Sequence, residues 1–333
     1  MSGIRDNKLF ISVVTPALNE EKNIPVLYNA LKEAFNEVHC LFELVVVDDG
    51  STDSTREVVA TLSKETDSQV KGVFLARNFG HQAAFNAGID ATSGDAVIVM
   101  DADLQHPPSV IPNMVKEFNK GADIVLGIRK ANEQNSIVRE FIGTLFYRFI
   151  NKISDIEFRE NAADFGLYSR QVIETLKALP EKDRFLRGLV QWVGFTRGEV
   201  VYTSQKRQHG VSKYSYRKLI QLAMIGVTSF SAFPLRASFW LGLGVSIFSF
   251  IYALYIVFVY ATGGGNSLPP GWPSIMVVIL FFGGLQFMIL GIIGEFLFRQ
   301  YQETKGRPLY IVHKRVGFVK GECNQSKYGI INE

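Results

Sequence analysis

Short apolar runs alternate with amphipathic stretches over the N-terminal part of the chain. Runs rich in β-branched residues occur at residues 10–15, 43–49 and 96–100, and such runs are typical of strands buried on both faces. Between the first two runs, apolar residues recur at helical spacing from Ile24 to Val38. This alternation predicts an α/β domain whose mainly parallel sheet is covered by helices on both faces.

Further signals extend this pattern. Ser54 and Glu57 have the spacing of a capping box, which predicts that a helix begins there. Strand-like residues follow at 70–76 and 123–127, with a helical stretch at about 81–91 between them. In parallel sheets of this kind, ligands bind beyond the carboxyl ends of the strands.

Two long uncharged runs dominate the last third of the chain. Residues 237–262 carry no charged side chain, and residues 274–294 are interrupted mainly by Gln286. A helix needs about 20 apolar residues to cross a bilayer, and both runs reach that length. The alternative, a pair of buried core helices, is disfavoured by the length of the runs. We therefore expect transmembrane helices at about 237–262 and 274–298.

Basic residues flank this pair of runs and are absent from the turn between them. Arg236 precedes the first run, Arg299 and Lys305 follow the second, and residues 263–273 contain neither Lys nor Arg. By the positive-inside rule, both ends of the hairpin are cytoplasmic. The sequence thus predicts a multi-pass protein of the cytoplasmic (inner) membrane, with the catalytic domain and both termini in the cytoplasm.

Two basic amphipathic stretches are expected to lie in the membrane interface. Residues 136–153 interleave apolar side chains with Arg139, Arg148 and Lys152, and residues 214–235 have a similar build. A core helix with a solvated basic face is the alternative. The expected domains are residues 1–213 (catalytic), 214–235 (juxtamembrane), 236–299 (two transmembrane helices) and 300–333 (a cytoplasmic tail).

Polar motifs follow three of the predicted strands. They comprise residues 15–21, 48–53 and 101–105, which are rich in Asp, Asn and Glu. Because the carboxyl ends of parallel strands meet at one edge of a sheet, we expect these motifs to lie together. Each alone could be an ordinary loop, but three acidic loops at one edge indicate a binding site.

Asp101 and Asp103 are the expected metal ligands. Carboxylates one residue apart suit Mg²⁺ or Mn²⁺, which prefer oxygen ligands and retain substrate phosphates. The chain lacks a P-loop and a Gly-x-Gly-x-x-Gly fingerprint after its first strand, which disfavours an NAD-dependent oxidoreductase. A metal and basic side chains must then meet the phosphate charge, for which Arg129, Arg207 and Lys213 are the candidates, and together they would stabilise a departing nucleoside diphosphate.

Several segments together resemble one family of enzymes. They are PALNEEKNI, VVVDDGSTDST, RNFGHQAAFNAGIDATSGD, MDADLQHPP, ADFGLYSR and RQHGVSKYSYRKL, within Val14–Leu219. The chain is similar to the family 2 glycosyltransferases of the Rossmann-like GT-A fold. Within them it resembles the polyprenyl-phosphate glycosyltransferases, which include dolichol-phosphate mannose synthases and bacterial undecaprenyl-phosphate glucosyl- and aminoarabinosyl-type transferases. The resemblance implies transfer of one sugar from a nucleotide sugar to a polyprenyl phosphate at the cytoplasmic membrane face, with Mg²⁺ or Mn²⁺ as cofactor.

The resemblance also implies roles for individual residues, in which Asp48 would hydrogen-bond the base. The implied residues are, for the nucleotide sugar, Pro16, Leu18, Glu20, Asp48, Asp101, Ala102, Asp103, Gln105 and Arg129; for the metal, Asp101, Asp103 and Gln105; and for the acceptor phosphate, Arg207, Ser212 and Lys213. The usual family motif is Asp-Ala-Asp-Leu-Gln-Asp-Pro-Pro. Because His106 replaces its last Asp, position 106 is not expected to be an essential ligand.

The chemistry of the acceptor bears on Asp164. A phosphate monoester has a second pKa of about 6 and is already anionic at neutral pH, so it needs positioning more than a general base. Asp164 lies in the region where a base is expected, and we assign it to positioning the acceptor or the sugar. A helix N-cap or a salt bridge with Arg170 is the alternative. The expected catalytic set is Asp103, Asp164, Arg207 and Lys213.

The short membrane anchor favours UDP-glucose as donor and undecaprenyl phosphate as acceptor, with inversion at the anomeric carbon. GDP-mannose is the alternative donor. A processive polysaccharide synthase is disfavoured because the chain lacks Gln-x-x-Arg-Trp and has two expected spans. A catalytically inactive nucleotide-sugar-binding scaffold is a further alternative, and a homo-oligomer is left open. The net charge of +3 gives no reason to expect nucleic acid as a partner.

Overall fold

The computed structural model describes most of the N-terminal part of the chain and a C-terminal stretch. The described residues are 9–130, 162–179, 181, 186–204, single positions between 238 and 262, and 271–318. The chain divides into two compact units, of which the first holds residues 1–151, 156–215 and 307–333 and the second holds residues 152–155 and 216–306.

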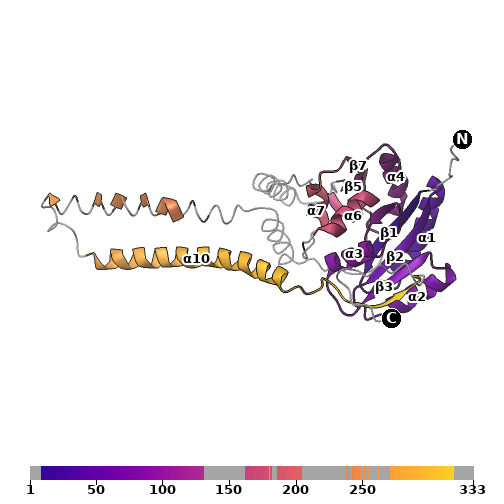
Figure 1. The fold of residues 1–333 in the computed structure, drawn as a ribbon, viewed down its shortest axis with the longest axis horizontal. Helices are drawn as coiled ribbons and strands as arrows, with labels where there is room; N and C mark the ends of the chain where they lie inside the picture. Colours follow the sequence, from indigo (N-terminus) through magenta and orange to yellow (C-terminus); the bar gives the residue numbers. More distant parts are fainter. Residues whose placement is uncertain are drawn as a thin grey trace. The chain divides into compact units, whose positions relative to one another are not determined.

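The first unit is built on one sheet with helices on both faces (Figure 1). Its strands are β1 (Phe10–Ala17), β2 (Leu41–Asp48), β3 (Val70–Leu75), β4 (Ala96–Val99), β5 (Ile124–Arg129), β6 (Ala162–Ser169), β7 (Arg197–Tyr202) and β8 (Val312–Val316). Its helices are α1 (Asn23–Val38), α2 (Thr55–Glu65), α3 (His81–Asp90), the short η1 (Pro108–Val110), α4 (Ile111–Asn119), α6 (Arg170–Ala178) and α7 (Leu186–Trp192).

The eight strands lie in the order β7-β5-β6-β4-β1-β2-β3-β8. Four neighbouring pairs are parallel, namely β1–β2, β1–β4, β2–β3 and β5–β7, whereas β6 runs antiparallel to β4 and β5, and β8 to β3. The predicted α/β class is confirmed, and the parallel core is β1 to β4. The antiparallel strands β6 and β8 make the sheet mixed, a feature that the apolar pattern did not predict.

Burial on both faces explains why the central strands are almost continuously apolar. Helices α1, α2 and α4 pack together on one face, and α3, α6 and α7 contact the other. Helix α3 lies especially close to β1, because a Cβ on Gly88 would come within 2.3 Å of Cγ1 of Val14. Only glycine fits there, so this packing fixes the position of α3 on the sheet.

The strand directions bring six strand ends to one edge of the sheet. Strands β1 to β4 are mutually parallel, and β5 and β7 run the same way because each is related to them through the reversed strand β6. The loops after these strands therefore share one edge with the start of β6. This edge holds all three polar motifs, as the sequence predicted.

The start of α2 differs in one detail from the predicted capping box. Ser54 is the N-cap residue, but its side chain makes no capping hydrogen bond. The side chain of Asp53 takes this role, since its Oδ1 accepts from the N–H of Thr55 at 3.1 Å. The N–H of Ser54 donates to Oε2 of Glu21 at 3.0 Å, so the loop is oriented by a contact from a different loop.

The segment expected as a C-terminal tail contributes to the sheet. Strand β8 pairs with β3 at the sheet edge, and just before it Tyr310 is only 1% exposed. The middle of β8 is polar, with His313, Lys314 and Arg315. An edge strand tolerates such residues because part of it faces solvent, and this is why the apolar pattern did not reveal it.

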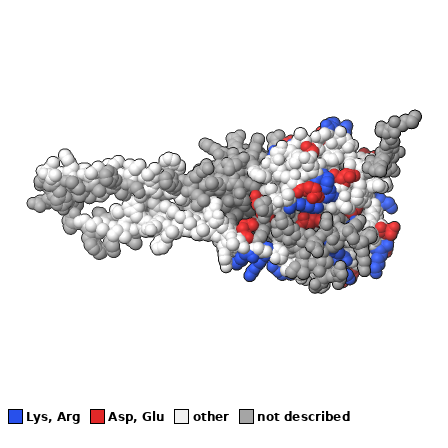
Figure 2. Space-filling model, in the orientation of Figure 1, with Lys and Arg blue, Asp and Glu red and all other residues white. Residues whose placement is uncertain are grey.

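The second unit contains α10 (Trp272–Thr304). Its window Phe281–Phe298 has a mean hydropathy of 1.8 and no buried residue, and it is the one candidate membrane span among the described residues. Figure 2 shows a long face of this helix without Lys, Arg, Asp or Glu. The predicted helix at 274–298 is therefore present. The described positions between 238 and 261 are helical, but they are too scattered to establish a second span.

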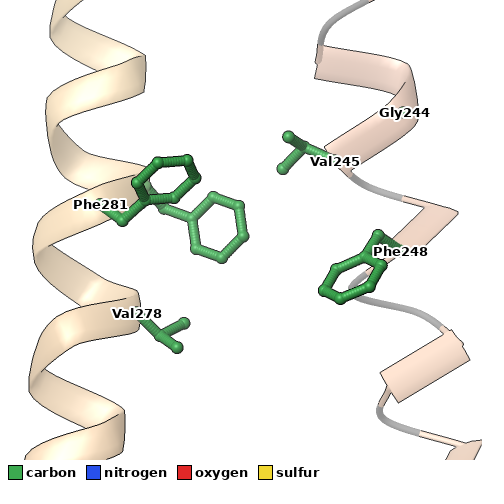
Figure 3. Close-up of a pocket in the computed structure, with 6 residues that line it drawn as sticks. Gly244, Val245, Phe248, Val278 and Phe281 are labelled. Atoms are coloured by element: carbon green, nitrogen blue, oxygen red, sulfur yellow. The ribbon is translucent and has the colours of Figure 1, made fainter.

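Within this unit the two helical segments face each other across an apolar cavity (Figure 3). Val245 and Phe248 point toward α10, and Val278 and Phe281 point back at them. The predicted interfacial segments 136–153 and 214–235 lie outside the described residues.

Candidate active site

The first two polar loops at the sheet edge are fastened to each other. The side chain of Asn19 accepts from the N–H of Thr52 at 2.8 Å, and its own N–H donates to Oγ of Ser51 at 2.9 Å. The N–H of Glu20 donates to Oγ1 of Thr55 at 3.0 Å. Many polar groups of both motifs thus shape the loops, while Leu18 and Glu20 stay half-buried at the edge and Pro16 is buried.

Asp48 and Asp49, at the end of β2, are both buried. Oδ2 of Asp48 lies 2.6 Å from Nε of Arg56, and its Oδ1 accepts from the N–H of Ser51 at 3.1 Å. Asp48 is fully buried, so in this structure it holds the end of β2 to α2. Its predicted bond to the base stays a prediction and requires the loop to open toward the ligand.

Asp49 fixes the loop that precedes α3. Its two oxygens accept from the N–H groups of Phe79 at 2.7 Å and Gly80 at 3.0 Å. Burial raises the pKa of Asp49 above its ordinary value, although these two N–H donors oppose the rise. Gly50, with a positive φ of 79°, allows the close approach, because a Cβ there would lie 2.7 Å from N of Asn78.

The Asp101–Gln105 motif forms a tight turn after β4. Oδ1 of Asp103 accepts from the N–H of Gln105 at 3.0 Å, and the backbone of Leu104 has a φ of 63°. A left-handed conformation is costly for a residue with a branched side chain, and it persists here because the turn packs into the core. Asp103 is 6% exposed. The turn therefore holds the Asp103 carboxylate in place through the backbone of Gln105.

His106 is a structural residue of this turn. Its Nδ1 accepts from the N–H of Asp101 at 3.0 Å, and its ring stacks on Phe165 at 5.0 Å and meets Tyr202 edge-on at 6.0 Å. Burial lowers the pKa of His106 below its ordinary value, against the attraction of nearby carboxylates. A neutral, packed imidazole agrees with the expectation that position 106 is not an essential ligand.

A second imidazole reaches Asp101, at its carboxylate. Nε2 of His81, the first residue of α3, lies 3.2 Å from Oδ1 of Asp101. Partial loss of solvent around its ring, which is 46% exposed, would lower the pKa of His81, but Asp101, supported by Asp164 and Asp49, raises it above the ordinary value. The sequence analysis missed His81, although the residue lies in a segment that carried the family resemblance.

Asp164 lies at the site edge and not at a helix end. It belongs to β6, and the pairing of Gly166 with Val99 places it beside the end of β4. The helix N-cap alternative is wrong, because the N-cap of α6 is Ser169, whose side chain accepts from the N–H of Val172. Arg170 contacts backbone carbonyls near the opposite edge, where Arg170 N also donates to Asp95 O.

Of the residues predicted to meet phosphate charge, the structure describes only Arg129. Arg129 is exposed at the end of β5. After β7, Oγ of Ser204 donates to the carbonyl oxygen of Gln105 at 3.2 Å, so the chain leaves the described part of the structure beside the Asp101–Gln105 turn. Arg207, Ser212 and Lys213 follow at once in the sequence and lie outside the described residues.

The oxygen groups at this edge fit a hard divalent cation. Asp101, Asp103 and Gln105 offer carboxylate and amide oxygens from one turn, which is the ligand type that Mg²⁺ and Mn²⁺ prefer. Among the described residues, no three His, Cys, Asp or Glu side chains form a ready-made site. One or two carboxylates suffice for such a cation when substrate phosphates complete its shell, so the donor diphosphate is expected to bind with the metal.

Comparisons with known proteins identify the family of this chain. Residues 12–177 match the model of the family "Glycosyl transferase family 2". The bactoprenol glucosyl transferase of Shigella phage SfII is 41% identical over 305 residues, which are 91% of this chain and 97% of the relative. That of Shigella phage SfX is 40% identical over 306 residues, or 92% and 99%.

One further relative and one solved structure are also similar to this chain. An uncharacterized glycosyltransferase of Synechocystis is 39% identical over 91% of this chain and 94% of its own length. Among solved structures, glucosyl-3-phosphoglycerate synthase from Mycobacterium tuberculosis, in complex with Mn²⁺, UDP-glucose and phosphoglyceric acid, is 22% identical with a TM-score of 0.46, covering 66% of this chain and 77% of that one. The family model and the relatives that match over nearly their whole length show that the chain is a glycosyltransferase and belongs to glycosyl transferase family 2.

Proposed function

We propose that this glycosyltransferase is a GT-A-type enzyme that moves one glucose from UDP-glucose to undecaprenyl phosphate at the cytoplasmic membrane face. The observation that carries the proposal is the meeting of Asp101, Asp103 and Asp164 at one sheet edge, in a chain whose α10 is long and apolar enough to cross a bilayer. The names of the near-complete relatives support a bactoprenol acceptor and a glucosyl group.

The donor diphosphate would bind against the turn after β4. Asp101, Asp103 and Gln105 would hold Mg²⁺ or Mn²⁺, which supplies charge stabilisation for the leaving diphosphate. Arg129 projects from the end of β5 at the same edge. Three extended residues span at most about 11 Å, so Arg207 is within reach of the turn that Ser204 contacts. This reach supports the proposal that Arg207, together with Ser212 and Lys213, meets donor or acceptor phosphate.

The acceptor phosphate would attack the anomeric carbon directly. An anionic phosphate oxygen needs no proton removed, so Asp164 would position the acceptor or the sugar and need not act as a base. One metal-bound leaving group and one anionic nucleophile favour a single displacement, which inverts the anomeric centre. The product would be a β-linked sugar from an α-linked donor.

The strand order supports a two-helix membrane hairpin. Strand β7 precedes the second unit, β8 follows it, and both strands belong to the same sheet. A chain that leaves one sheet and returns to it must cross a membrane an even number of times. If α10 is one span, another is required, and the uncharged residues 237–262 are the candidate. The positive-inside rule then places the catalytic domain in the cytoplasm.

A donor screen tests this proposal. The purified full-length protein in detergent would be given labelled UDP-glucose or GDP-mannose with undecaprenyl phosphate and Mg²⁺ or Mn²⁺. Labelled lipid should form from UDP-glucose. Lipid labelled only from GDP-mannose would make the chain a mannosyltransferase, and nucleotide-sugar binding without any lipid product would make it an inactive scaffold.

A further inference from the structure

Asp101 is flanked by two imidazoles that play different parts. Oδ1 lies 3.2 Å from Nε2 of His81, and Oδ2 lies 3.7 Å from Nδ1 of His106. Nδ1 of His106 already accepts a hydrogen bond from the N–H of Asp101. A nitrogen that accepts at this position carries no proton and cannot also donate to the carboxylate. His81 is therefore the imidazole that is able to hold the Asp101 side chain.

The position of His81 is set by groups on both sides of it. The two preceding N–H groups, of Phe79 and Gly80, are bound by Asp49, and the ring of His81 packs edge-on against Phe85 with 4.5 Å between centroids. Helix α3 is itself seated closely on the sheet through Gly88. The imidazole thus stands on a rigid support at the start of a helix.

We propose that His81 is a positioning residue of the donor site, which holds Oδ1 of Asp101 and so directs the rest of that carboxylate toward the metal-bound diphosphate. The inference rests on the metal-dependent transfer proposed above. His81 contacts a group that would touch the metal, and its effect passes through Asp101. Without His81, the Asp101 side chain would lose the 3.2 Å contact that orients its Oδ1.

Two substitutions separate this role from simple packing. His81→Phe keeps a ring against Phe85 and removes the donor. His81→Gln places an amide N–H near the position of Nε2 and keeps the donor without the ring. His39→Asn is the matched control, because His39 is exposed between α1 and β2, at the opposite edge of the sheet, and its φ of 53° suits asparagine.

The primary measurement is the dissociation constant of Mn²⁺ in the presence of UDP, taken from the EPR signal of free Mn²⁺ in the full-length protein. His81→Phe should weaken binding by about tenfold, and His81→Gln by less than about threefold, as expected for a group that orients a metal ligand. His39→Asn should leave it unchanged. Thermal unfolding would check folding, and if the phenylalanine disturbs packing, His81→Ala compared with His81→Gln gives the same contrast.

Two results would overturn the inference. One is wild-type Mn²⁺ binding by a folded His81→Phe protein. The other is a ¹⁴N coupling to bound Mn²⁺ in the wild type that disappears in His81→Gln, which would make His81 a direct ligand. The assay uses Mn²⁺ and UDP without sugar or acceptor. A failure of this inference can therefore be told apart from a failure of the proposed sugar transfer in the donor screen.

Discussion

The phenol of Tyr310 donates a hydrogen bond to Oδ2 of Asp90 at 2.7 Å. Tyr310 lies between the end of α10 and β8, and Asp90 is the last residue of α3, whose first residue is His81. The segment that returns from the second unit is therefore anchored to the helix that reaches Asp101. This hydrogen bond should therefore contribute to the stability of the first unit.

Removing this one hydroxyl should destabilise the first unit. Tyr310→Phe keeps the buried ring and leaves the Asp90 carboxylate without its phenol donor, which should cost about 1.5–3 kcal/mol, the range for hydrogen bonds to charged groups. Denaturant unfolding of the full-length protein in detergent measures the change. Tyr301→Phe, at an exposed position of α10, is the control. Equal stability of the Tyr310 and Tyr301 variants would show that the anchor contributes nothing.

A second prediction concerns a buried ion pair at the opposite edge of the sheet. Oε2 of Glu43 lies 2.9 Å from Nζ of Lys71, and Oε1 accepts from Oγ of Ser12 at 2.5 Å and from the N–H of Ser93 at 3.0 Å. Burial acts to raise the pKa of Glu43, but the bonds from Ser12, Lys71 and Ser93 prevail and lower it below its ordinary value.

Glu43→Gln should therefore destabilise the protein by about 3–5 kcal/mol at neutral pH, because it leaves the charge of Lys71 buried. A lowered folded-state pKa gives stability that is present above the ordinary pKa of glutamate and is lost as the pH falls through the folded value. The gap between wild type and variant should narrow in acid. An exposed control, Glu65→Gln, should show no gap, and a pH-independent gap for Glu43→Gln would contradict the ionic account.

Much of the fold could be predicted because the central strands are buried on both faces and read as apolar runs. β6 and β8 could not be found this way. The run containing Asp164 was recognised as a motif but not as a strand, and β8 is polar at its centre. Register and strand direction depend on contacts between distant segments, such as Val99 with Gly166, which leave no local trace in the sequence.

The location of the candidate site could be predicted from the sequence more readily than the contacts between its side chains. Acidic residues after parallel strands meet at one edge of the sheet, so strand order predicted where Asp101 and Asp103 lie, and their spacing and the family resemblance suggested their role. His81 was not, because a histidine at the start of a helix has no distinctive spacing from Asp101. Asp48 was expected to face a ligand, and only the structure shows Arg56 against it.

Asp103, the proposed metal ligand, gives a third prediction. Asp103→Asn keeps the shape of the side chain and removes its charge, so sugar transfer should fall by more than about a hundredfold while the protein stays folded. Asp67→Asn, at an exposed turn, should transfer normally. Excess chelator should stop the wild type, and added Mg²⁺ or Mn²⁺ should restore it. Full turnover in chelator would remove the metal from the mechanism.

The proposed membrane topology gives a fourth prediction. With Cys40 and Cys323 replaced by serine, a cysteine at Ser267 should react with an impermeant maleimide added to intact cells, and one at Glu65 should react only after lysis. Glu65 is exposed at the end of α2, so its protection would report topology and not burial. Labelling of position 65 from outside would place the sheet on the other side of the membrane.

The proposed reaction joins one glucose to a lipid phosphate, so the mass and linkage of the product provide its decisive test. The wild-type protein would be incubated with UDP-glucose, Mg²⁺ or Mn²⁺ and undecaprenyl phosphate, and the extracted lipid measured by mass spectrometry and NMR. The expected product is undecaprenyl phosphate carrying a single hexose with a β-anomeric coupling constant. A lipid carrying several hexoses, an α-linked product, or lipid of unchanged mass would contradict it.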